Sequence, residues 1–195
     1  DQFQLHPEDH VGLFVGHNYR LKGLIPLLYA LRQLPRQLPF KLMICGSARF
    51  HRYARLADRL GVGECVRFLG FHPEVREAFF AADFLIHPSF YDPCALVTLE
   101  ALACGLPVIT TKLNGASELL TPSLATLTID TPHAHATMAA QIIRLCDSEQ
   151  RSQLAREARE LAQRWTFHQH YQALLEIFRE VAAKKTPTSR IQRSG

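Results

Sequence analysis

Six short apolar runs alternate with amphipathic segments along the first two thirds of the chain, and this alternation constrains the fold more than any other feature. The runs cover residues 11–16, 40–46, 65–70, 83–89, 106–111 and 124–129. Most are apolar on both faces, which is typical of parallel strands covered by helices on both sides. The segments between them, at 22–34, 49–61, 73–82 and 96–105, are compatible with crossover helices. The sequence therefore predicts an α/β fold with a doubly wound, mainly parallel open sheet and right-handed crossovers.

After residue 132 the pattern becomes helical only. Apolar residues at three- and four-residue spacing predict helices over 133–148, 149–165 and 166–184. No linker or internal repeat interrupts residues 1–183, so we expect them to form one domain. The final stretch "KKTPTSRIQRSG" contains four basic residues and no acid, and it accounts for the whole net charge of +4. We expect residues 184–195 to be a basic, disordered tail on a nearly neutral body that does not bind nucleic acid.

Composition excludes several other classes of protein. The chain has 195 residues, 47% of them apolar, and no apolar run approaches the roughly 18 residues that span a bilayer. Its five cysteines are widely spaced, without a C-x-x-C pair, which favours neither a disulfide scaffold nor a zinc site. The histidines form no H-E-x-x-H motif. We therefore expect a cytoplasmic protein without a metal centre.

The loops that follow the predicted strands are the expected place for a ligand, because open parallel sheets bind ligands beyond the carboxyl ends of their strands. The first loop, "GHNYRLKG", places Arg20 and Lys22 just before a helix, either as a site for a diphosphate or as solvated surface charges. The second, "GSAR", begins with Gly46, which permits close approach of the backbone to a ligand or forms a plain turn.

The stretch "YDPCALVTLEALACGLPVITT" contains the most informative loop. Pro93 restricts Asp92 to extended conformations, so the next helix starts no earlier than about residue 94. The backbone N–H groups of Ala95 and Leu96 would then face the cleft as free donors at the positive end of that helix. Glu100, one turn further on, is either an exposed side chain or an acceptor for ligand hydroxyls. Two acids around a row of N–H groups suit a nucleotide sugar, which has hydroxyls at both ends and phosphates between them.

Three segments together carry a family resemblance: "GHNYRLKGL", the long block from "VRFLGFHPEV" through "YDPCALVTLEALACGLPVITTKLNGASEL", and "RWTFHQHYQALLEIF". They resemble the C-terminal, nucleotide-binding half of GT-B glycosyltransferases. The resemblance is to retaining family 4, the glycosyl transferases group 1, which includes lipopolysaccharide core glucosyltransferases. It covers nearly all of residues 11–182 and implies a Rossmann-like domain that ends in helices.

The resemblance also implies roles for individual residues. Glu100 would hold the ribose hydroxyls and Asp92 would approach the transferred hexose. Arg20 and Lys22 would bind the diphosphate together with the backbone at Ala95 and Leu96. The residues that would line the nucleotide base are Gly46, Arg67, Gly70 and Phe71. Two positions depart from the family pattern, because Asp92 stands where Glu is commonest and Ala95 stands where Gly is usual.

The family implies a two-domain enzyme, and only one domain fits within this chain. We therefore expect the donor-binding domain of a retaining hexosyltransferase that uses a nucleotide diphosphate sugar, with a UDP-sugar favoured, and no metal or other cofactor. Its acceptor would be a glycan or lipid-linked glycan, as in lipopolysaccharide biosynthesis, reached through an N-terminal domain outside this chain and beside the cytoplasmic membrane. Without that domain we expect no activity. A nucleotide-sugar epimerase of the same architecture and a non-catalytic nucleotide-sugar-binding subunit are the alternatives.

Overall fold

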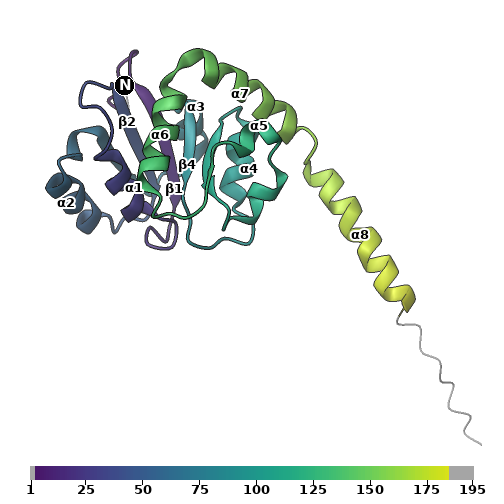
Figure 1. Ribbon diagram of the computed structural model, residues 1–195. Coiled ribbons are helices and arrows are strands. Elements are labelled where there is room, and N and C mark those ends of the chain that lie inside the picture. Colours follow the sequence, from purple (N-terminus) through teal and green to yellow (C-terminus); the bar gives the residue numbers. More distant parts are fainter. Residues whose placement is uncertain (1–2, 185–195) are drawn as a thin grey trace, which may run out of the picture. The chain divides into compact units, whose positions relative to one another are not determined.

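The computed structural model describes residues 3–184, so the predicted tail lies outside the described residues apart from Lys184. The chain divides after Ala162 into two units, and each is described by itself. The first unit contains the sheet and helices α1 to α7, and the second contains α8 (Figure 1).

The secondary structure alternates as the apolar runs predict. The strands are β1 (His10–Gly16), β2 (Phe40–Gly46), β3 (Val66–Gly70), β4 (Phe84–His87), β5 (Val108–Thr111) and β6 (Thr128–Ile129). The α-helices are α1 (Leu24–Leu31), α2 (His51–Leu60), α3 (Val75–Phe80), α4 (Leu96–Ala103), α5 (Pro122–Ala125), α6 (His135–Cys146), α7 (Ser148–Ala162) and α8 (Phe167–Lys184). Two short 3-10 helices, η1 (Gly63–Cys65) and η2 (Gly115–Leu119), complete the described elements.

The strands form one six-stranded sheet in the order β3-β2-β1-β4-β5-β6, and every neighbouring pair is parallel. The longest pairing joins β1 to β2, from His10 opposite Phe40 to Gly16 opposite Gly46. The predicted doubly wound parallel α/β sheet is confirmed.

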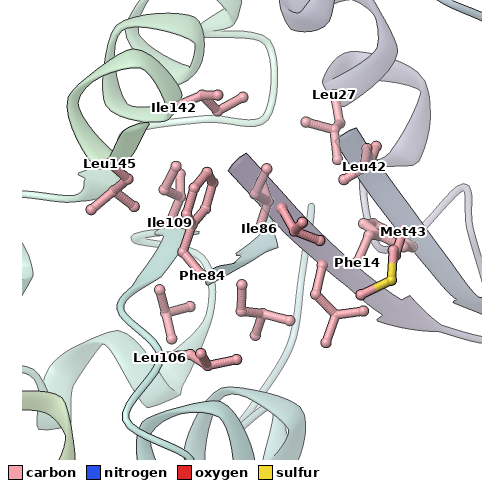
Figure 2. Close-up of a cluster of buried hydrophobic side chains, with 14 of the residues drawn as sticks. Phe14, Leu27, Leu42, Met43, Phe84, Ile86, Leu106, Ile109, Ile142 and Leu145 are labelled. Carbon is pink, nitrogen blue, oxygen red and sulfur yellow. The ribbon is translucent and has the colours of Figure 1, made fainter. Parts of the chain in front are cut away.

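Helices cover the sheet because its strands are apolar on both faces. The four residues of β4 are all buried, as are those of β5. Helix α6 packs beside α1, while α4 packs against α7. Figure 2 shows Leu27 of α1 and Ile142 and Leu145 of α6 gathered with side chains of the strands in the buried core.

The predicted strand over 124–129 is wrong in its first half. Pro122 occupies the first turn of α5, and the Thr121 hydroxyl accepts a hydrogen bond from the Leu124 N–H at the N-cap. A capping threonine followed by proline favours a helix start, which outweighs the apolar character of Leu124 and Ala125. Only Thr128 and Ile129 pair with β5.

The second unit contains the predicted C-terminal helix. Over α8 the apolar residues recur at three- and four-residue spacing, among them Tyr171, Leu174 and Phe178. Among residues 3–184 no helix combines the length and apolar character needed to cross a bilayer.

Candidate functional site

The order of the strands reverses between β1 and β4, in the middle of the sheet. The chain runs outward from β1 to β2 and β3, and later outward from β4 to β5 and β6. The crossovers after β1 and β4 therefore lead in opposite directions along the sheet. Doubly wound sheets bind ligands at the switch point between them, which we call the opening between β1 and β4. The loop 17–23 follows β1 at this opening, and the loop 88–95 follows β4.

Lys22 and Asp92 meet at this opening as an ion pair. Lys22 Nζ donates a hydrogen bond to Asp92 Oδ2. Burial raises the pKa of Asp92, but the hydrogen bond and charge of Lys22, helped by His87, outweigh it and hold that pKa below its ordinary value. The Lys22 side chain is 22% exposed, so it is partly accessible from solvent.

A tight turn after β1 positions Lys22. Asn18 Oδ1 accepts a hydrogen bond from the Leu21 N–H at 3.1 Å, and the Asn18 carbonyl accepts one from the Lys22 N–H at 2.9 Å. Gly23 then has φ +80°, and a Cβ at this residue would lie 1.9 Å from the Pro88 carbonyl oxygen. Glycine is therefore required where the loop after β1 crosses the loop after β4.

His87, the last residue of β4, lies beneath the ion pair and is only 1% exposed. Its Nε2 lies 3.5 Å from Asp92 Oδ2, longer than an ordinary hydrogen bond, and its ring stacks on Phe14 with 6.3 Å between centroids. Burial lowers the pKa of His87 to about 4, and the charge of Lys22 adds to this effect while Asp92 opposes it. The imidazole is therefore neutral at pH 7 and adds no second cation to the pair.

Asn114 joins the loop after β5 to the start of α4. Its fully buried Oδ1 accepts hydrogen bonds from the N–H groups of Ala95 and Ala116, both at 3.1 Å. Its Nδ2 donates to Thr98 Oγ1 at 3.1 Å and to Thr110 Oγ1 at 3.0 Å. All four bonding positions of this amide are satisfied, so Asn114 fixes the first turn of α4 against β5 and η2.

The backbone of Asp92 is tied to the same loop. The Asp92 N–H donates to the Leu113 carbonyl at 3.1 Å, and the Gly115 N–H donates to the Asp92 carbonyl at 2.9 Å. A Cβ at Gly115 would lie 1.9 Å from the Pro93 carbonyl oxygen, so only glycine fits at this bridge. We call these contacts between Asp92 and residues 113–115 the Asp92–Asn114 bridge.

The prediction that Ala95 offers a free N–H group is wrong, because that group donates to Asn114. Ala95 is the N-cap of α4 and is buried. Leu96, the first residue of the helix, is 62% exposed at the carboxyl edge. Backbone N–H groups of the first helical turn have no carbonyl partner within their own helix, so the donors that remain for an anion start at Leu96.

The predicted acidic and basic partners differ in how close they lie to this pair. Glu100 is exposed on α4, on the same side of the helix as Leu96 four residues earlier. This position fits both a plain exposed side chain and an acceptor for ligand hydroxyls. Arg20 is also exposed, and among residues 3–184 no ion pair involves it. The structure thus brings Lys22, and not Arg20, to Asp92.

The residues expected to line a nucleotide base are spread along β2 and β3. Gly46 has φ +141°, and a Cβ there would lie 2.0 Å from the Gly16 carbonyl oxygen, so the close approach is to β1. The Arg67 guanidinium donates to the Glu64 and Val66 carbonyls, at 2.9 and 3.3 Å, near the amino end of β3. In this structure the Arg67 side chain thus turns toward carbonyls near the start of β3, and its role at a nucleotide base stays a prediction. Gly70 and the 67%-exposed Phe71 do lie at the carboxyl end of β3.

Two residues of the site, His87 and Asn114, carry no expectation from the sequence. His87 sits in an apolar run and reads as a core residue until its neighbour across the opening is known. Asn114 precedes Gly115 and reads as a turn residue. A polar residue within a buried strand, or in the short loop that follows one, was the available signal for both. Among the described residues, no group of three or more His, Cys, Asp or Glu side chains is placed to hold a metal ion.

Comparison with known proteins shows the family of the chain. The family model for glycosyl transferases group 1 matches residues 1–165. The chain belongs to this family. Its structural neighbours are glycosyltransferases of the GT-B fold, as the resemblance implied.

Two curated relatives illustrate the range of the family. The chain is 33% identical over 181 residues to a D-inositol 3-phosphate glycosyltransferase of Corynebacterium urealyticum, covering 86% of this chain and 42% of the relative. It is 36% identical over 105 residues to the lipopolysaccharide glucosyltransferase WaaG of Escherichia coli K12, covering 53% of this chain and 28% of the relative. The chain thus spans less than half the length of these relatives.

A solved structure places a ligand in a related fold. The Anabaena protein HepE in complex with UDP-glucose aligns with a TM-score of 0.74 and 25% identity, over 88% of this chain and 49% of that one. That protein is thus solved with a nucleotide sugar, and about half of its chain shares the fold described above.

Proposed function

We propose that this chain is the donor-binding domain of a retaining glycosyltransferase that transfers a hexose from a nucleotide diphosphate sugar. The observation that carries the proposal is the Lys22–Asp92 pair at the opening between β1 and β4, beside the first turn of α4. Its cation, its carboxylate and the helical N–H groups match the diphosphate and the hydroxyls of such a donor.

The ion pair suggests how the donor is engaged. The diphosphate oxygens compete with Asp92 for the ammonium group of Lys22, since both are anionic acceptors. Once Lys22 turns to the diphosphate, the Asp92 carboxylate is free to accept a hydrogen bond from a hexose hydroxyl. Lys22 then stabilises the negative charge that develops on the leaving nucleoside diphosphate. The backbone N–H of Leu96 also donates to the diphosphate. One helical turn later, the Glu100 carboxylate accepts hydrogen bonds from the ribose hydroxyls.

The comparisons support the donor class without identifying the acceptor. HepE is solved with UDP-glucose, which favours a UDP-sugar. One relative is named for inositol 3-phosphate and another for lipopolysaccharide, so the acceptor we propose is a hydroxyl group of a sugar or polyol on a glycan or lipid-linked glycan. Its site would be completed by a domain outside this chain, in a cytoplasmic enzyme at the membrane surface. We propose that Lys22 and α4 neutralise the diphosphate without a metal ion.

Calorimetric titration with UDP, GDP and ADP tests the proposal. We expect at least one of them to bind, with an affinity that EDTA leaves unchanged. Lys22→Ala should weaken that binding, while Arg36→Ala, which removes an exposed positive charge from the loop before β2, should not. Folded protein that binds none of the three nucleotides would contradict the proposed donor site.

A further inference from the structure

A second opening lies on the same edge of the sheet, on the β2 side of β1. It is a hollow of about 590 Å³ between the loop after β1 and the start of α2. We call it the arginine hollow, and its lining residues are His17, Asn18, Tyr19, Ser47, Arg49, Arg52 and Tyr53. Its volume lies within the range of pockets that hold small molecules. Neither Lys22 nor Asp92 lines it, so it is separate from the ion pair described above.

The walls of the arginine hollow are two buried tyrosines. Tyr19 is 2% exposed and Tyr53 3% exposed, and their rings meet edge to face with 5.2 Å between centroids. The Tyr19 hydroxyl donates to the Ser47 carbonyl at 2.9 Å, which ties the loop after β1 to the loop after β2. Because both rings are buried and the loops are joined, the shape of the hollow is set before a ligand arrives.

The hollow offers cationic donors and no acid. The Arg52 guanidinium lies 4.6 Å from the centroid of the Tyr53 ring and donates to the Tyr53 hydroxyl at 2.5 Å, which holds it at the wall. Arg49 is exposed, and its backbone N–H donates to Ser47 Oγ at 3.1 Å, so the serine hydroxyl proton remains to be donated. Within residues 3–184, no carboxylate lines the hollow or forms an ion pair with either arginine.

Two guanidinium groups with a hydroxyl and an amide around one hollow match a group with many acceptor oxygens and a double negative charge. A phosphate monoester has three terminal oxygens, whereas a carboxylate has two, and planar guanidinium groups bind phosphate through paired hydrogen bonds. The volume exceeds that of an isolated ion, which leaves room for the molecule that carries the phosphate. We propose that the arginine hollow is a second anion-binding site and takes the phosphate monoester of a sugar or polyol.

This inference uses the proposed function in one respect only, because it assigns the donor diphosphate to Lys22 and so leaves the arginine hollow for a different phosphate. Titration of the full chain at low ionic strength, followed by backbone amide NMR, tests it with inorganic phosphate, glucose 6-phosphate, glucose and UDP as separate probes. We expect phosphate and glucose 6-phosphate to shift the amides of residues 47–53, and glucose alone to leave them unchanged.

The variant Arg49→Gln removes an exposed charge without disturbing the core. Together with Arg52→Gln it should weaken glucose 6-phosphate binding about tenfold or more, since charged hydrogen bonds are lost, and leave UDP affinity within about twofold. Arg55→Gln with Arg59→Gln is the matched control, because it removes the same charge from exposed positions of the same helix. Thermal melts confirm that each variant is folded. If Arg52→Gln disturbs packing, Arg49→Gln alone still tests the hollow and should give a smaller loss of glucose 6-phosphate binding.

Three results would overturn the inference. The first is the absence of any shift at residues 47–53 in folded protein. The second is an equal loss of glucose 6-phosphate binding in the Arg55/Arg59 control, which would indicate a general effect of charge. The third is displacement of glucose 6-phosphate by UDP together with its loss in Lys22→Gln, which would place it in the donor site. Failure of UDP to bind contradicts the donor proposal instead, and leaves the phosphate titration readable.

Discussion

The two sides of β1 at the carboxyl edge differ in whether their charged side chains are paired. On the β4 side, Lys22 is paired with Asp92, and the buried Asn114 has every hydrogen bond satisfied. On the β2 side, Arg49 and Arg52 face a hollow without a carboxylate partner among the described residues. The charged groups on the first side are thus paired within the folded structure, whereas the positive charges on the second have no carboxylate partner among the described residues. Substitutions should therefore alter stability on one side and ligand binding on the other.

Removing Asn114 should give the largest effect. Asn114→Ala removes the partner of the buried Thr98 hydroxyl and of the Ala95 and Ala116 N–H groups. The Thr110 hydroxyl keeps its bond to the His87 carbonyl. Since each such group costs about 1–3 kcal/mol, we expect unfolding free energy to fall by about 3 kcal/mol or more. Urea unfolding measures this loss. Arg49→Gln, the counterpart on the β2 side, should change stability by less than about 0.5 kcal/mol. A comparable loss of stability in both variants would contradict the expected difference between the two sides.

Acid should weaken the β4 side through His87. The pKa of His87 is about 4 in the folded protein, against about 6.5 for an unfolded histidine. Between these values the unfolded chain binds more protons, so this contribution is fully present above pH 6.5 and is lost as the pH falls toward 4.

The size of this acid effect is about 3 kcal/mol. In His87→Gln the decline of stability between pH 7 and pH 4.5 should be smaller than in the parent by about 2 to 3 kcal/mol. Urea unfolding at both pH values measures it, with the exposed His51→Gln as control. A variant whose stability declines with acid as steeply as the parent would show that His87 is not the titrating group.

Lys22 should contribute both to the ion pair with Asp92 and to ligand binding, because its side chain is paired yet partly exposed. Lys22→Ala should weaken binding of the preferred nucleoside diphosphate by about tenfold to a hundredfold, the value of one or two charged hydrogen bonds. The same change should raise the pKa of Asp92, because Lys22 holds it down. Calorimetry measures the affinity and carboxyl carbon NMR the titration of Asp92. An unchanged affinity with a raised pKa would restrict Lys22 to a structural role.

Glu100 should show the smallest effect on the fold and a specific effect on the ligand. It is exposed, so Glu100→Gln and Glu100→Ala should each change stability by less than about 0.5 kcal/mol. If Glu100 binds the ribose, the parent should bind UDP several-fold more tightly than 2′-deoxy-UDP, and Glu100→Ala should bind the two equally. A preference for UDP that survives in Glu100→Ala would assign the ribose to another residue.

The sequence predicted the sheet well because strands that are buried on both faces consist of short runs of apolar residues. It placed Lys22 and Asp92 at one site, since loops after parallel strands meet at one edge. It could not show that Asn114 occupies the Ala95 N–H, because the two residues are 19 positions apart and only the register of β5 brings them together. Nor could it show that the Arg67 guanidinium donates to the Glu64 carbonyl, because a flexible side chain can turn back toward carbonyls that precede it.

If Asp92 contacts a sugar as we propose, the Asp92–Asn114 bridge affects how the choice of that sugar can be changed. Since Asp92 exchanges backbone hydrogen bonds with residues 113–115, the loops after β4 and β5 behave as one mechanical part. Inserting a single residue after β5 would move the Asp92 carboxylate as surely as a substitution beside it. Libraries that vary the two loops separately would then recover mostly damaged proteins, whereas libraries that vary them together would keep the carboxylate in reach of its ligand.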